Sequence, residues 1–297
     1  MKHTIAVTLV LVAVFFCAQV IGLVVTNNYI DHQATKATGN VTFTKLPLEI
    51  ERPPVKQNSS FLYIISAILI ATVLIFLLIK FRQPILWKIW FFLAVIVCLT
   101  ISLAGFMGQW VALPISIGLA LFKIFRPNVF VHNLTEVFIY GGLAAIFVPI
   151  MNIFAAVMLL ILISIYDVFA VWKSGHMIKL AKFQTEAKVF AGLLVPYKRD
   201  RGFAVKAKMP RGRQEVKNAV LGGGDIGFPL MFAGVVMKGL MLQTGELAGF
   251  LTTLIIPVCA AIALLLLLVK AKQDKFYPAM PFISIGCFIG YGIVALL

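Results

Sequence analysis

Residues 152–172 read NIFAAVMLLILISIYDVFAVW, a run in which the only charged side chain is Asp167. A bilayer core about 30 Å thick is crossed by roughly 20 apolar residues in a helix. The run therefore has the length and composition of a transmembrane helix. Because its single acid lies within the run rather than in a loop, the same stretch indicates both the fold and a candidate site.

Eight further runs share this character, and the composition of the whole chain agrees with them. Apolar residues make up 61% of the chain and charged residues 12%, against about 25% charged in an ordinary globular domain. That balance argues against a soluble enzyme and against a disordered chain. We predict an all-α polytopic membrane protein with nine transmembrane helices. The other eight runs cover residues 5–26, 61–79, 88–106, 109–125, 133–150, 218–238, 246–269 and 277–297. The first run is too long for a signal peptide and has no Ala-x-Ala site, which predicts a retained helix.

The distribution of Lys and Arg predicts the orientation of the helices. With the N-terminus inside and the C-terminus outside, 21 of the 26 Lys and Arg residues fall in inside segments, as the positive-inside tendency requires. Twelve of them lie in one long inside loop, 173–217, which we expect to rest on anionic lipid headgroups. Nucleic-acid binding is disfavoured because no aromatic platform accompanies these charges. The other long loop, 27–60, is predicted outside.

The loops divide the chain into three parts. A six-helix part, 1–172, carries Asp167, and a three-helix part, 218–297, carries a second intramembrane acid, Asp225. The basic cytoplasmic loop 173–217 joins them. It contains one apolar stretch, 190–195.

The two acids are predicted to lie at a common depth. Asp167 precedes Lys173 by six residues and Asp225 follows Lys217 by eight, which places them about 9 and 12 Å from the inside face. A charge at such depth costs at least a few kcal/mol and marks a functional site by default. A structural ion pair is the alternative, but the nearest basic residues, Lys173 and Lys238, lie near helix ends.

Two carboxyl groups in one low-dielectric site favour a particular chemistry. Both cannot ionise easily, so the pair shares one proton. The ionised carboxylate can accept a proton from water, and the protonated one can donate to a carbonyl oxygen. This arrangement suits peptide hydrolysis and needs neither a metal nor a cofactor.

Two further segments are predicted at the same depth. Gly222, Gly223 and Gly224 precede Asp225; three glycines weaken a helix and expose backbone to which a peptide substrate can add as a strand. The alternative is close helix packing through small residues. Pro278-Ala279-Met280-Pro281 opens the last run and predicts an extended or broken helix entry. The alternative is an ordinary N-terminal proline.

Together these segments resemble the motifs of a known family. Tyr166-Asp167, Gly222-Gly223-Gly224-Asp225 and Pro278-Ala279-Met280 are similar to the YD, GxGD and PAL motifs of presenilins and signal peptide peptidases. Met280 replaces the motif leucine, a swap of similar volume. The sequence looks most like archaeal presenilin homologues.

The resemblance implies an intramembrane aspartyl protease in which Asp167 and Asp225 are the catalytic pair. Tyr166 and the glycines 222–224 would shape the site, and Pro278, Ala279 and Met280 would help to hold a transmembrane peptide substrate. It also implies a multi-pass protein of a prokaryotic, archaeal cell membrane, surrounded by lipid and acting without obligate protein partners.

Three other readings stay open. A proton-coupled transporter or channel also uses intramembrane acids. A prepilin-peptidase-type GxGD protease shares one motif, and a catalytically inactive scaffold would retain the fold. Serine and zinc proteases are disfavoured because the sequence has no GxSxG or HExxH.

The remaining titratable residues are expected to be structural. The four histidines lie in predicted loops or at span ends, so we expect them to be solvated or interfacial, and Glu136 lies near the inside end of its span, so we expect it to be interfacial. The cysteines lie in apolar runs without CxxC spacing and are expected to be small core residues. These sets are His3, His32, His132 and His176, and Cys17, Cys98, Cys259 and Cys287.

Overall fold

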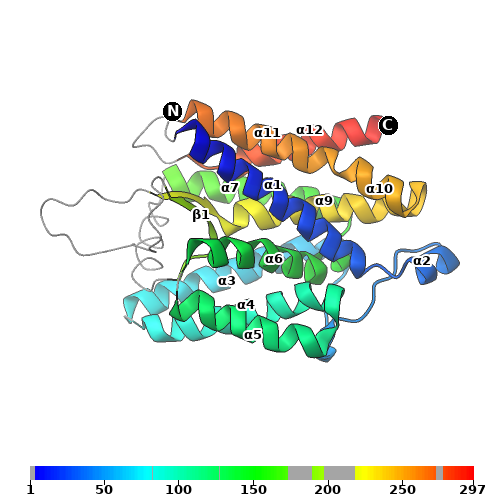
Figure 1. Cartoon of the computed structure of the whole chain (residues 1–297). Coiled ribbons are helices and arrows are strands. Elements are labelled where there is room, and N and C mark those ends of the chain that lie inside the picture. Colours follow the sequence, from blue (N-terminus) through cyan, green and yellow to red (C-terminus); the bar gives the residue numbers. More distant parts are fainter. Residues whose placement is uncertain (1–3, 82, 127, 173–188, 197–217, 272–276) are drawn as a thin grey trace, which may run out of the picture.

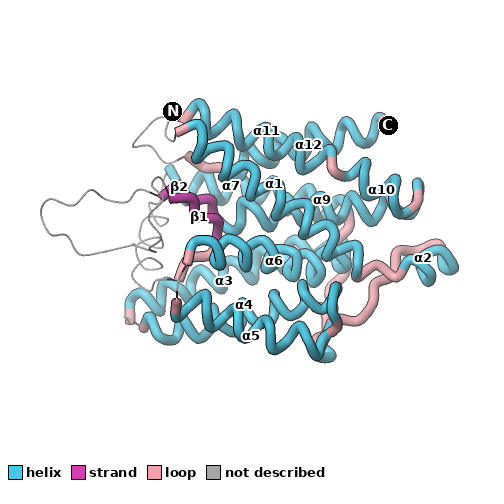
Figure 2. Tube along the Cα trace, in the orientation of Figure 1, coloured by secondary structure: helices cyan, strands magenta, loops and turns pink. Residues whose placement is uncertain are grey.

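The computed structural model of the chain describes residues 4–81, 83–126, 128–172, 189–196, 218–271 and 277–297. These residues form a bundle of long helices with one small sheet at an end of the bundle (Figures 1 and 2). The helices are α1 (Ile5–Asn28), α2 (His32–Thr38), α3 (Ser60–Lys80), α4 (Pro84–Met107), α5 (Gln109–Phe125), α6 (Val129–Phe147), α7 (Ile153–Trp172), α9 (Gly223–Thr244), α10 (Glu246–Thr253), α11 (Ile255–Lys270) and α12 (Met280–Leu296). The short elements are the 3-10 turns η1 (Pro47–Glu49), η2 (Gln57–Ser59) and η3 (Val148–Ile150), and the strands β1 (Gly192–Pro196) and β2 (Asn218–Gly222).

Helices form at all nine predicted runs, which supports a multi-pass membrane protein. Seven of the helical segments are long and apolar enough to cross a membrane, and α5 and α12 are shorter apolar helices. The eighth run is divided at Leu254, between α10 and α11. Pro257 lies in the first turn of α11, where its missing N–H leaves no bond unmade.

The predicted seventh helix begins later than expected. Residues Asn218–Gly222 form strand β2, and only at Gly223 does helix α9 start. Strand β2 pairs antiparallel with β1, in a register that sets Gly192 opposite Gly222 and Pro196 opposite Asn218. The prediction of a helix from residue 218 is therefore wrong, because a short apolar run by itself does not distinguish a strand from a helix.

Helices α6 and α9 lie at the centre of the bundle, and α3 lies at its edge with few buried side chains. The main core draws its buried side chains from α1, α6, α7, α9, α11 and α12 and from both strands. The two chain ends lie at opposite ends of the bundle, and the strands lie at the end where α1 begins (Figures 1 and 2).

The segment between α1 and α3 packs against the opposite end of the bundle from the strands. The Tyr29 hydroxyl donates to the Ile101 carbonyl at 2.6 Å, and Arg52 donates to the carbonyls of Ala145 and Thr44. Burial raises the pKa of Tyr29 to about 12, so its hydroxyl keeps the proton that it donates. These bonds attach the long loop predicted outside to α4 and α6.

Candidate active site

Asp167 lies near the C-terminal end of α7, against the start of α12. Its side chain is 7% exposed, and its Oδ2 accepts a hydrogen bond from the Met280 backbone N–H at 3.1 Å. Met280 is the first residue of α12, where a helix has N–H groups without intrahelical partners. A carboxylate at this position stabilises the helix start. The Pro278–Met280 segment is thus in direct contact with the first predicted catalytic acid.

Asp225 lies in the first turn of α9, immediately after the sheet. Gly222 ends β2 and is also the N-cap of α9, and its backbone N–H bonds to the Asp225 carboxyl group. The Gly223 N–H donates to the Ala191 carbonyl at 3.2 Å. The glycine run is therefore the junction at which a strand turns into a helix, with the acid held beside it.

The three predicted segments come together in space. Helices α7, α9 and α12 pack on one another, and the carboxyl groups of Asp167 and Asp225 interact electrostatically. Three residues before Asp167, the Ser164 hydroxyl bonds that of Ser284 at 2.9 Å and joins α7 to α12. The packing of these helices therefore brings two acids that are far apart in sequence into one region of the bundle, and their common depth in a membrane stays a prediction.

Tyr166 is placed differently from the other predicted site residues. It is 38% exposed, and its hydroxyl makes no hydrogen bond with another described residue. Neighbouring residues on a helix point about 100° apart, so burying Asp167 turns Tyr166 toward the outside of the bundle.

Neither acid forms a salt bridge within the part of the chain that the structure describes. The Nζ of Lys238 donates instead to the carbonyls of Val148, at 2.9 Å, and Met151, closing the C-terminal end of α6 and η3. Lys173 and the rest of the predicted basic loop, apart from residues 189–196, lie outside the described residues, as do His3 and His176. The described residues thus offer no ion pair that would make the two acids merely structural.

Two residues expected at the interface are buried, and these predictions are wrong. His132 and Glu136, both on α6, are 4% and 1% exposed. The Lys123 ammonium on α5 meets the Glu136 carboxylate at 2.6 Å, so the bundle holds an ion pair that sequence reasoning missed. Its one sequence signal is the spacing of His132, Glu136 and Tyr140, which places three polar side chains on one face of a helix.

The cysteines agree with their prediction only in part. Cys98 and Cys287 are buried, whereas Cys17 is exposed on α1. Among the described residues, no three His, Cys, Asp or Glu side chains are grouped to hold a metal ion.

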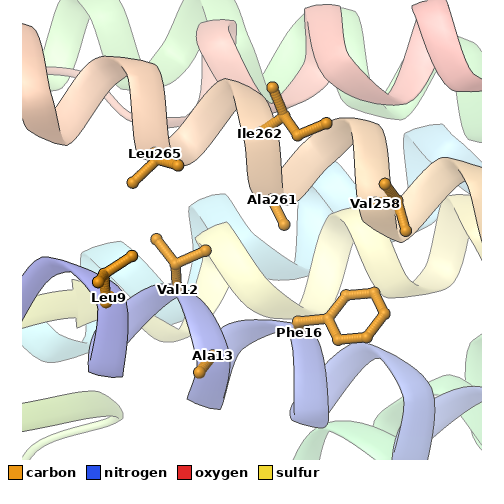
Figure 3. Close-up of a pocket in the computed structure, with 8 residues that line it drawn as sticks. All are labelled: Leu9, Val12, Ala13, Phe16, Val258, Ala261, Ile262 and Leu265. Carbon is orange, nitrogen blue, oxygen red and sulfur yellow. The ribbon is translucent and has the colours of Figure 1, made fainter.

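A groove between α1 and α11 is separate from this site. Its lining consists only of apolar side chains, which face each other across the two helices in Figure 3: Leu9, Val12, Ala13, Phe16, Val258, Ala261, Ile262 and Leu265. It offers no group for acid–base chemistry, and we assign it no catalytic role.

Comparison with known proteins identifies the family. Residues 33–297 match the family described as "Signal-peptide peptidase, presenilin aspartyl protease", and the chain belongs to this family of intramembrane aspartate proteases. A solved structure of a presenilin family intramembrane aspartate protease, in a C222 crystal, has 17% identity to this chain and a TM-score of 0.62; the match covers 97% of this chain and 98% of that one. A structure of the same description, in a P2 crystal, has 16% identity and a TM-score of 0.60, covering 96% of each chain. No curated protein matches.

Proposed function

We propose that this chain hydrolyses peptide bonds within or near transmembrane segments of other membrane proteins, using Asp167, Asp225 and one water molecule. The observation that carries the proposal is the meeting of three segments at one place in the bundle, where Asp167 is buried and Asp225 is half-buried. Asp167 accepts a bond from Met280 at the start of α12 and interacts with Asp225 at the start of α9.

The proposed reaction is a general acid–base hydrolysis. One carboxylate removes a proton from water, and the water oxygen forms a bond to the scissile carbonyl carbon. The other carboxyl group gives its proton to the carbonyl oxygen, producing a neutral gem-diol. When the C–N bond breaks, the proton held by the first carboxyl passes to the leaving nitrogen, and one gem-diol hydroxyl returns its proton to the other carboxylate, which restores the starting pair. The products are a carboxyl and an amino terminus. Because the acids act as a pair, neither is assigned as the base.

The strand that precedes Asp225 has an edge free of other described strands, which supports binding of the substrate as an extended peptide. Leu193 and Val195 of β1 face Leu221 and Ala219 of β2, and no strand of the described chain pairs with the other edge of β2. Extended peptides add to such edges through backbone hydrogen bonds. Bound there, the substrate would run past the glycine junction toward the two acids, with Pro278 and Ala279 on the other side. Met280 and Tyr166 would complete the surroundings.

We further propose nine membrane crossings, with the N-terminus inside and the C-terminus outside, in a prokaryotic cell membrane. Chain ends at opposite ends of the bundle support an odd number of crossings, and the Lys and Arg distribution supports the direction. The six-helix part with Asp167 and the three-helix part with Asp225 would together enclose one site.

The test is cleavage of a purified single-span peptide in detergent, with the products read by mass spectrometry. The same preparation, placed in liposomes, is assayed for proton and ion flux. Cleavage within the apolar segment without flux supports the protease. Flux without cleavage of any single-span peptide in a panel would overturn it in favour of a transporter or channel.

A further inference from the structure

Strand β1 is held by α6 through side chains instead of a further strand. Asn133 bonds both backbone groups of Leu194: its Oδ1 accepts from the N–H at 2.9 Å, and its Nδ2 donates to the carbonyl at 2.7 Å. Glu136 Oε2 accepts from the Gly192 N–H at 3.1 Å, and His132 Nε2 donates to the Gly192 carbonyl at 2.7 Å. Four backbone groups on one edge of β1 thereby receive partners from three side chains.

These bonds matter because unpaired backbone groups inside a membrane protein are costly. Along an antiparallel strand, alternate residues direct their N–H and C=O toward the partner strand and the rest direct them away. Gly192 and Leu194 bond to α6, so Leu193 and Val195 are the residues that bond to β2. The side chains of α6 therefore determine which residues of β1 direct their backbone N–H and C=O groups toward β2.

Glu136 is itself held by residues that balance its charge. Its Oε1 lies 2.6 Å from the Lys123 ammonium, and Oε2 also accepts from the Tyr140 hydroxyl. Lys123 is 5% exposed and donates in addition to Thr135 at 3.0 Å. Burying both charges costs several kcal/mol, and their attraction offsets this only with good geometry. A pair kept at this cost, with one oxygen aimed at a strand, indicates a positional role.

The held strand leads directly to the second acid. Gly192 lies opposite Gly222 in the sheet. The φ angle of Gly192 is +142°, a value that residues with a side chain rarely adopt. A Cβ there would meet the Leu221 carbonyl oxygen at 2.2 Å. Gly222 in turn is the N-cap of α9 and bonds to the Asp225 carboxyl group, whose Oδ2 would lie 3.2 Å from a Cβ added at Gly222. A shift of β1 would thus move the backbone on which Asp225 stands.

We propose that Glu136, held by Lys123, is a positioning residue whose bond to the Gly192 N–H fixes β1 and, through β2, the place of Asp225. Its effect on cleavage rests on the proposed proteolytic function. Its effect on the sheet does not, so the two are measured separately.

Two matched variants isolate the acceptor oxygen from the charge. Both contain Lys123→Met and Tyr140→Phe, which remove the buried cation and the hydroxyl that would otherwise lose their partner. One adds Glu136→Gln, whose amide oxygen still accepts from Gly192, and the other adds Glu136→Leu, which cannot accept. Neither variant contains a buried unpaired charge, so both are expected to fold.

The first measurement is hydrogen exchange of peptides covering residues 189–196 and 218–226. A lost buried hydrogen bond is worth about 1 kcal/mol, so we expect exchange in both peptides to be roughly five- to tenfold faster in the Leu variant than in the Gln variant. Peptides from α11 should exchange alike. Equal exchange of the two variants in either peptide overturns the proposal, whether or not the protein cleaves any substrate.

The second measurement is the kinetics of cleavage. A misplaced acid weakens an interaction of the transition state, so we expect kcat to be about tenfold lower in the Leu variant than in the Gln variant, with KM changed less. Faster exchange with equal kcat overturns the link from β1 to Asp225. Absence of cleavage in the unmutated protein overturns the proposed function. The exchange comparison still tests whether Glu136 fixes β1.

Discussion

Gly223 has less free space than its neighbours in the glycine run. A Cβ added there would lie 2.8 Å from the Tyr140 hydroxyl oxygen, and one added at Gly224 would approach only the movable Phe228 ring, at 3.1 Å. In the GxGD motif that the chain resembles, Gly223 is the variable position. The structure thus identifies a constraint that the motif does not contain.

We expect Gly223→Ala to lower the cleavage rate about tenfold, because the start of α9 must move away from Tyr140 and a small misplacement of a catalytic group is costly. Gly224→Ala, the matched control, should lose much less. Adding Tyr140→Phe to Gly223→Ala removes the obstructing oxygen and should recover part of the rate, relative to Tyr140→Phe alone. Initial rates of substrate cleavage check this. Equal rates for the two alanine variants would contradict the steric argument.

The shared proton of the acid pair predicts the form of the pH dependence. The pair is active only when one carboxyl is protonated and the other ionised, so kcat should fall on both sides of an acidic-to-neutral optimum. Cleavage rates between about pH 4 and 9, with the folded state monitored in parallel, provide the measurement. A rate that does not change across this range while the protein stays folded is incompatible with the mechanism.

At the scale of elements, α11 and α12 approach closely through two glycines one helical turn apart. A Cβ at Gly286 would meet the Cys259 carbonyl oxygen at 2.7 Å, and one at Gly290 would meet the Ile256 Cα at 2.8 Å. Small residues at this spacing allow helix backbones to pack within a membrane. Because the first residue of α12, Met280, bonds to Asp167, the packing of α12 against α11 also supports the site.

Gly286→Ala and Gly290→Ala should each lower the free energy of unfolding by about 1–3 kcal/mol, since the added methyl would meet backbone atoms and Cβ atoms of α11, which cannot rotate out of its way. Gly292→Ala is the control, because no atom lies within 4 Å of its added Cβ, and it should be neutral or slightly stabilising. Unfolding in detergent, followed by circular dichroism, measures both. If Gly286→Ala were as stable as Gly292→Ala, the close approach of the two helices would be disproved.

Elements differed in how well the sequence predicted them. The long helices follow from composition, because only about 20 consecutive apolar residues in a helix satisfy both the bilayer and the backbone. Strand β2 did not follow, since its five residues pair with β1, which lies 22 to 30 positions earlier in the chain. The burial of Glu136 depends on Lys123 from a neighbouring helix, and pairing between helices cannot be read from either helix alone.

At the scale of the whole molecule, the depth argument predicts that the two acids belong to one site. Counting residues from the inside charges places Asp167 and Asp225 in one predicted layer, and the two helices that carry them, α7 and α9, pack on each other. The bond from Met280 to Asp167 was less predictable, because it depends on how α12 docks. The sequence therefore indicated which segments meet, and the packing of three helices determined which atoms touch.

The proposed orientation predicts which loops face which side. The cysteine introduced by Lys36→Cys lies in the segment predicted outside, so it should react with a membrane-impermeant maleimide in intact cells. One at Lys80→Cys, at the exposed end of α3, should react only after lysis. Both are made in a chain whose four native cysteines are replaced. The reverse pattern would show that the N-terminus lies outside.

The central claim is that Asp167 and Asp225 together perform the hydrolysis, and its most direct test is cleavage by isosteric variants. Asp167→Asn and Asp225→Asn keep the side-chain shape and an acceptor for the neighbouring N–H, but neither can exchange a proton as a carboxyl does. Glu246→Gln is the control: Glu246 is the first residue of α10, at the end of the bundle away from the strands, where its carboxylate contacts Asn27 and His32. We predict no detectable product from either Asp variant, an unchanged cleavage site and rate for Glu246→Gln, and all three variants folded. Continued cleavage by either folded Asp variant at the site used by the unmutated protein would contradict the account.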